Sequence, residues 1–137
     1  MIKMKNQKGF TLIEVMIAVA ILGIIAAIAV PSYSSFMTKT RRADAIVMLT
    51  DIAGEQQRFF SEQNRYATSM TELGYGADPL PSKEGWYSIS VVTPTQTSYV
   101  LTAAPIAGEP QANDTECGDF TLNSGGVKDS GGGIDCW

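Results

Sequence analysis

The sequence predicts an α+β protein in which one long, bent N-terminal helix packs on a small antiparallel β-sheet. Residues 10–30 are almost entirely apolar and lead into residues 31–61, which have helical periodicity. Residues 62–137 alternate short runs of Tyr, Ile, Val and Thr with Gly and Pro, as β-hairpins do. The 137 residues contain no histidine, which excludes Ser-His-Asp and Cys-His catalysis and histidine-based metal sites. We therefore expect neither an enzyme nor a bound cofactor.

A basic leader, residues 1–9, precedes the apolar segment and carries three lysines and no acid. Residues 10–30 contain a single charged side chain, Glu14, and as a helix would be about 31 Å long, the thickness of a bilayer's hydrocarbon core. The segment therefore predicts a membrane-spanning helix. The alternative is a signal peptide cleaved after Ala29. Against it stand an apolar run longer than the usual ~7 to 15 residues and the carboxylate within that run.

Glu14 is the residue of this segment that most needs a partner. A charge near the end of an apolar span costs on the order of a few kcal/mol unless it is hydrated or paired. Hydration at the headgroups suffices for an isolated inserted helix. If the chain were cut between Gly9 and Phe10, however, the new α-amino group could pair with Glu14 of a neighbouring chain.

The stretch at residues 8–33, KGFTLIEVMIAVAILGIIAAIAVPSY, closely resembles the N-terminal signature of type IV prepilins and the related pseudopilins. The resemblance implies that a membrane-embedded prepilin peptidase cuts after Gly9 and that the same enzyme N-methylates Phe10. It also implies that Glu14 pairs with the N-terminal amine of an adjacent subunit during filament assembly.

Two residues predict a bend in the long helix. Pro31 has no N–H to donate to the carbonyl of Ala27, and Gly23 is a second weak point. Both fall on the helix-softening positions of the family that the signature resembles. Beyond Pro31, an apolar stripe is expected to pack on the sheet while the charged face meets solvent. The expected stripe is Ile46, Leu49, Ala53, Gln56 and Phe60, flanked by Ile52 and Phe59.

The remaining chain is expected to form the sheet. Residues 62–85 contain several Gly and Pro and predict a connecting loop with room for one helical turn at Ser69–Leu73. The expected strands are Trp86–Thr93, Ser98–Ala104 and Cys117–Leu122, with a short fourth segment near Val127.

Cys117 and Cys136 are the only cysteines, and such a pair in a small exported domain most simply means a disulfide. A disulfide that closes a loop of this length contributes about 3 kcal/mol to the stability of the folded chain. The alternative is that both cysteines are free, buried thiols. Because a disulfide requires an oxidising compartment, we expect the C-terminal part in the periplasm and the leader in the cytoplasm.

The resemblance implies a structural subunit of a type IV pilus that is inserted in the inner membrane and assembled into a helical surface filament. Residues 64–75 and 117–137 look like the short minor pilins, so a minor pilin is expected. The partners implied are other pilin subunits, the prepilin peptidase, the inner-membrane pilus assembly machinery and the lipid bilayer. Two alternatives stay open, a type II secretion pseudopilin and a secreted binding domain released by signal peptidase.

The acidic C-terminal part bears on two further functions, calcium binding and nucleic-acid binding. Its acids match no EF-hand spacing, so a solvated acidic loop is favoured over a calcium site. After Ser61 the chain has three bases and ten acids, which argues against direct nucleic-acid binding by the monomer. The acids near the cysteines are Asp114, Glu116, Asp119, Asp129 and Asp135.

Overall fold

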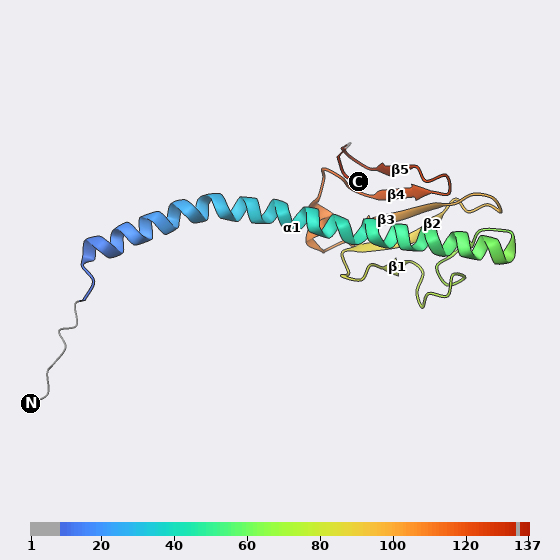
Figure 1. Ribbon diagram of the computed structural model, residues 1–137, viewed down its shortest axis with the longest axis horizontal. Coiled ribbons are helices and arrows are strands. Elements are labelled where there is room, and N and C mark those ends of the chain that lie inside the picture. The colour runs from blue at the N-terminus through green and yellow to red at the C-terminus, as the bar shows by residue number, and fades with distance from the viewer. Residues whose placement is uncertain (1–8, 134) are drawn as a thin grey trace, which may run out of the picture. The chain divides into compact units, whose positions relative to one another are not determined.

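The structure is a computed structural model that describes residues 9–133 and 135–137 (Figure 1). The chain divides into two compact units, Met1–Phe36 and Met37–Trp137. The helix α1 (Leu12–Gln63) contributes residues to both units. The expected leader lies outside the described residues, apart from Gly9.

Local hydrogen bonds mark both ends of α1. At its start, the Glu14 N–H donates to Thr11 Oγ1 at 3.3 Å, so Thr11 caps the first turn. At its end, Asn64 adopts a left-handed conformation with φ 55° and donates its N–H to the Phe60 carbonyl at 2.8 Å. Asparagine tolerates this conformation, which commonly terminates helices. The helix therefore begins and ends two residues later than the sequence predicted.

In the first unit, α1 continues through both Gly23 and Pro31. An 18-residue window of α1 reaches a mean hydropathy of 2.8 and is not buried in the protein, so its length and composition suit a membrane span. The bend predicted at the two residues stays a prediction.

The second unit contains a five-stranded sheet in the order β1-β2-β3-β4-β5, with every neighbouring pair antiparallel. Residues 37–63 of α1 lie along one face of this sheet (Figure 1). The strands are β1 (Leu80–Pro81), β2 (Tyr87–Val92), β3 (Val100–Pro105), β4 (Phe120–Asn123) and β5 (Lys128–Ser130). The predicted α+β class, with a long helix on a small antiparallel sheet, is confirmed.

Several local predictions need correction. The connecting loop contains the short strand β1, in which Leu80 pairs with Ile89 of β2. A strand of two residues is too short to produce a recognisable sequence pattern. The expected helical turn at Ser69–Leu73 is instead a turn closed by a 3.1 Å bond from the Tyr75 N–H to the Met70 carbonyl. The third strand begins at Phe120 rather than Cys117, and a short 3-10 helix, Pro110–Asn113, was not predicted.

The buried stripe of α1 is displaced from the predicted one. Ile52 is fully buried rather than flanking, whereas Ile46 and Phe60 are only partly buried. Gln56 is tolerated in the core because its side-chain amide exchanges two hydrogen bonds with the backbone of Ala67, at 2.9 and 3.0 Å. The helix residues buried in the unit are Arg42, Ala45, Met48, Leu49, Ile52 and Gln56.

Alternate residues of the strands complete the core. Tyr87 and Ile89 of β2, Leu101 of β3 and Phe120 of β4 are fully buried, as expected for strands with one face covered. The rings of Tyr87 and Phe120 meet edge to face with centroids 5.8 Å apart.

The predicted disulfide is confirmed. Cys117 and Cys136 are bonded with an S–S distance of 2.04 Å and a Cα–Cα distance of 5.6 Å. Both residues are buried and belong to the core cluster, so the bond joins the segment after β5 to the segment before β4.

Candidate assembly site

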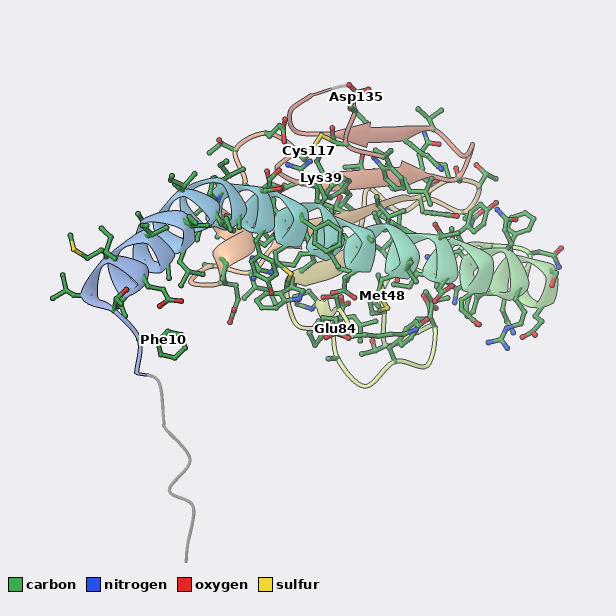
Figure 2. The ribbon with its side chains drawn as sticks, turned by 60° about the vertical axis from the view of Figure 1, so that its left-hand side comes forward. Phe10, Lys39, Met48, Glu84, Cys117 and Asp135 are labelled. Atoms are coloured by element: carbon green, nitrogen blue, oxygen red, sulfur yellow. A yellow bond between two sulfur atoms is a disulfide. The ribbon has the colours of Figure 1, made fainter. Side chains whose placement is uncertain are left out.

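The predicted cleavage position lies in an accessible part of the chain. Gly9 and Phe10 precede the first residue of α1 and are exposed, and the Phe10 side chain is 83% exposed (Figure 2). Proteolytic cleavage favours exposed backbone outside secondary structure. The structure therefore leaves the peptide bond between these residues exposed and outside α1.

Glu14 lies in the first turn of α1, close to Phe10. These two side chains, with Val15, Ala18 and Val19, line a hollow of about 380 Å³. In the described part of the chain, no cation forms an ion pair with the Glu14 carboxylate. The structure thus brings together the two residues predicted for assembly and leaves the acid available to another chain.

Glu14 also has a local role that the sequence analysis missed. Thr11 and Glu14 have the Thr-x-x-Glu spacing of a capping box, and the bond from the Glu14 N–H to Thr11 Oγ1 is the first half of that motif. An acid in the first helical turn also interacts favourably with the helix dipole. The spacing was visible in the sequence, and any test of Glu14 must separate capping from pairing.

From Leu12 to Val30, apart from Glu14, the surface of the helix is apolar on every side. Its large side chains are between 52% and 79% exposed. An apolar surface of this extent requires lipid or other protein around it. The exposed side chains are Leu12, Ile13, Val15, Met16, Ile17, Val19, Ile21, Leu22, Ile24, Ile25, Ile28 and Val30.

A second cluster of charges, in the second unit, joins α1 to the segment before β4. Arg42 donates from Nε to Asp114 Oδ2 at 2.7 Å and from Nη2 to Asp114 Oδ1 at 2.8 Å. Its Nη2 also donates to Glu116 Oε2 at 2.6 Å. The side chains of Arg42 and Asp114 are 8% and 3% exposed, whereas that of Glu116 is 73% exposed.

This cluster corrects the prediction of a solvated acidic loop at one residue, because Asp114 is buried whereas Glu116, Asp129 and Asp135 are exposed. Burial alone would raise the pKa of Asp114, but the hydrogen bonds from Arg42 and its charge lower that pKa below the usual value. The hydrogen bond to Asp114 raises the pKa of Arg42. Gln111 Nε2 adds a 2.8 Å hydrogen bond to Asp114 Oδ2. Both partners are therefore charged at neutral pH, and the cluster has a structural role.

The same segment offers a poor donor set for a metal. Among the described residues, one group has ligand atoms within 4.8 Å of one another, namely Asp114, Glu116 and Cys117. Cys117 is in the disulfide, and both acids are bonded to Arg42. These three residues therefore do not fit a calcium site.

Two family models match the chain in the regions described above. One, described as a prokaryotic N-terminal methylation motif, matches residues 4–30. The other, described as "Type IV minor pilin ComP, DNA uptake sequence receptor", matches residues 31–121. The apolar helix and the antiparallel sheet define a pilin. The chain belongs to the type IV pilin family.

Similar proteins of known identity agree with this assignment. The chain is 37% identical over 109 residues to the type IV major pilin protein PilA of Myxococcus xanthus, covering 77% of this chain and 48% of that protein. It is 41% identical over 94 residues to a fimbrial protein of Pseudomonas aeruginosa, covering 64% of this chain and 61% of that protein. The chain thus spans between about half and three fifths of the length of these relatives.

A solved structure shares the fold. The non-core minor pilin PilV of Neisseria meningitidis superposes with a TM-score of 0.54 and 21% sequence identity. The match covers 74% of this chain and 93% of the PilV chain. The similarity extends over most of the described chain and concerns the fold.

Proposed function

We propose that the chain is a structural subunit of a type IV pilus, of the minor type, that is inserted in the inner membrane and assembled into a helical filament. The observation that carries this proposal is an apolar helix of membrane-spanning length, none of which is buried, followed by a folded unit with its own core. Within a filament, packing against the helices of other subunits replaces the contact with lipid. The chain itself catalyses nothing in this role.

Processing is the first step of the proposal. Prepilin peptidase cuts between Gly9 and Phe10 and methylates the new amine, as the match of residues 4–30 to the methylation motif supports. The mass and N-terminal sequence of the protein from purified membranes test this step. A chain that begins with N-methylated Phe10 is expected, and a chain that begins at Val30 indicates release by signal peptidase instead.

Glu14 guides docking in the second step. Its carboxylate pairs with the Phe10 amine of a neighbouring subunit, an attraction that is strong because lipid and apolar side chains exclude water. Leaving one member of such a pair without its partner is strongly destabilising. The pair therefore favours one register of the incoming subunit over others.

We expect Glu14→Ala to be cleaved and methylated normally but to enter filaments at least about tenfold less well, because a buried amine then lacks its partner. Immunoblots of sheared filaments and of membranes measure both quantities. Thr11→Ala is the matched control, because it removes the side-chain cap and leaves the charge. Equal incorporation of wild type and Glu14→Ala contradicts the pairing role, and an equal loss in Thr11→Ala assigns the effect to helix capping.

The orientation proposed for the precursor places the folded unit in the periplasm. The disulfide between Cys117 and Cys136 supports this side, because disulfides persist in oxidising compartments. The partners proposed are the peptidase, the assembly machinery of the inner membrane and other pilins. Deletion of the gene discriminates the alternatives, since loss of surface filaments with intact protein export favours a pilus over a type II secretion pseudopilin.

One matching family model is described as a DNA uptake sequence receptor, but the charge of this chain does not favour such a role. Residues 37–137 contain seven bases and thirteen acids. One of those bases, Arg42, is buried against Asp114. Neutralising phosphates requires a stripe of exposed bases, so the charge distribution supports the prediction against direct DNA binding.

A further inference from the structure

A groove of about 440 Å³ lies beside α1 in the second unit, between the helix and the loop that joins β1 to β2. Its apolar wall includes Val47, which is 49% exposed, and Trp86, over whose ring the guanidinium of Arg41 lies 4.6 Å from the centroid. Figure 2 shows Glu84, a rim residue, on the side of the helix away from Cys117 and Asp135. The groove is therefore a half-apolar hollow at the β1 edge of the unit.

The groove contains acids that have no cation. Asp44 lines it, and its Oδ2 is buried without a hydrogen-bond partner in the described part of the chain. Glu84 is exposed at the rim. In the described residues, neither base of the groove forms an ion pair with Asp44 or Glu84. The Arg41 guanidinium lies over Trp86 with its Nε buried and without a hydrogen-bond partner, and Lys83 Nζ lies 3.8 Å from Asp51. An occupant with an apolar tip and an adjacent cation would suit this lining.

The turn between β4 and β5 presents such a tip. Val127 is 61% exposed, more than any other large apolar side chain that follows α1 in the described residues. Lys128 follows it, with Nζ 5.2 Å from the ring centroid of Trp137. The turn is held rigid because Asn123 Oδ1 accepts from the N–H groups of Gly125 and Val127, both at 2.9 Å. A rigid turn loses little conformational entropy on docking.

The groove and the turn lie on opposite edges of the same unit. β1 and β5 are the two edge strands of the sheet. The register also separates them along the strands, because Tyr87 pairs with Pro105 near the groove whereas Val100 pairs with Asn123 near the turn. A strand of six residues spans about 17 Å at about 3.3 Å per residue. One chain therefore cannot fill its own groove with this turn.

We propose that the β4–β5 turn of one copy, led by Val127 and Lys128, docks into the groove beside Trp86 of a second copy. Val127 covers the apolar wall, and Lys128 pairs with Asp44. Because the two surfaces differ and lie at opposite edges, the contact is heterologous and repeats from copy to copy, displaced along the strands each time. The inference rests on the proposed function for its setting, since a pilus is an open helical assembly.

A photo-crosslinking side chain tests the contact in the full-length protein. With p-benzoylphenylalanine at position 127, irradiation is expected to produce an adduct of twice the chain mass, in membranes and in sheared filaments. Mass spectrometry should map the adduct to Met37–Val47 or Lys83–Trp86. The same probe at Thr97, which is exposed in the turn between β2 and β3, is the control and should not label these segments.

A second experiment reverses the charges of Lys128 and Asp44, separately and together, and measures the yield of the crosslinked adduct. Lys128→Glu or Asp44→Lys should each lower the adduct yield about tenfold, because like charges then face each other. The double variant, Lys128→Glu with Asp44→Lys, should restore the yield to within about twofold. Glu62→Lys makes the same charge change as Asp44→Lys on an exposed part of α1 and should leave the yield unchanged.

The outcomes separate this inference from the proposed function. A chain that enters filaments but forms no adduct, forms it with a different protein, or forms it at other residues overturns the inference and leaves the pilus role intact. An unrestored double variant also overturns it. An adduct that maps to the groove in membranes, from a chain absent from every filament, supports the contact and contradicts the pilus role.

Discussion

At the scale of the residue, Arg42 illustrates how a single polar side chain can organise a small domain. Its side chain extends from a buried position of α1 and donates two hydrogen bonds to Asp114, which lies 72 residues later in the sequence. The carboxylate is almost completely buried, and this guanidinium, Gln111 and the backbone N–H groups of Glu116 and Cys117 satisfy it with hydrogen bonds. Glu116 adds a third contact from the exposed side.

We predict that Arg42→Met lowers the free energy of unfolding by about 3 to 5 kcal/mol, because it leaves Asp114 buried without its cation. Chemical denaturation of the full-length protein in detergent, followed by tryptophan fluorescence, measures this loss. Arg58→Met is the matched control, since the pair of Arg58 with Glu55 is solvent-exposed and should contribute less than about 1 kcal/mol. Equal effects of the two substitutions would contradict the buried role of Arg42.

At the scale of the element, the C-terminal segment depends on close backbone approach as well as on its disulfide. The N–H of Gly133 donates to the Glu116 carbonyl at 2.8 Å. A Cβ on Gly132 would lie 1.8 Å from the same carbonyl oxygen, closer than any real contact. The glycines after β5 therefore let the chain pass Glu116 and bring Cys136 to Cys117.

We predict that Gly132→Ala destabilises the protein by about 1 to 3 kcal/mol, because the backbone must shift to admit the methyl group. Gly54→Ala is the control within α1, where the added Cβ meets nothing within 4 Å. That substitution should stabilise the protein by about 0.5 to 1 kcal/mol, because alanine favours the helix interior. Thermal unfolding of both variants measures the difference, and two shifts of the same sign would be inconsistent with it.

At the scale of the whole molecule, the two units have different environments. The helix before Phe36 exposes apolar side chains on all sides, whereas Met37–Trp137 contains the sheet, the buried cluster and the disulfide. The second unit therefore satisfies its own hydrophobic core, while the first requires lipid or other helices.

We predict that a chain shortened to residues 37–137 folds without detergent and unfolds cooperatively, because all residues of the core cluster are retained. Near-ultraviolet circular dichroism and a single thermal transition are the measurements. The full-length chain under the same conditions should require detergent to remain in solution. A shortened chain with no tertiary signal would show that the first unit contributes to the core.

The accuracy of the sequence-based predictions differs from one structural element to another. Helix α1, the β2–β3 hairpin and the disulfide were predicted, because periodicity, turn residues and cysteine pairing are local or countable signals. The strand β1 was missed since it consists of two residues in a loop. The buried stripe was misplaced by a small rotation, because Ile46 and Ile52 are equally apolar and only packing decides which faces the sheet.

The sequence alone predicted the apolar helix, the position of Glu14 within it, cleavage after Gly9 and the family that these residues indicate. Tertiary structure decided which acids are buried, since Asp114 and Arg42 are 72 positions apart and only the fold brings them into contact. The tertiary structure also decided where the groove and the β4–β5 turn lie. Both are at edges of the sheet, and a sheet has edges only after its strands have paired. Local patterns fix local geometry, whereas burial and adjacency depend on the whole folded chain.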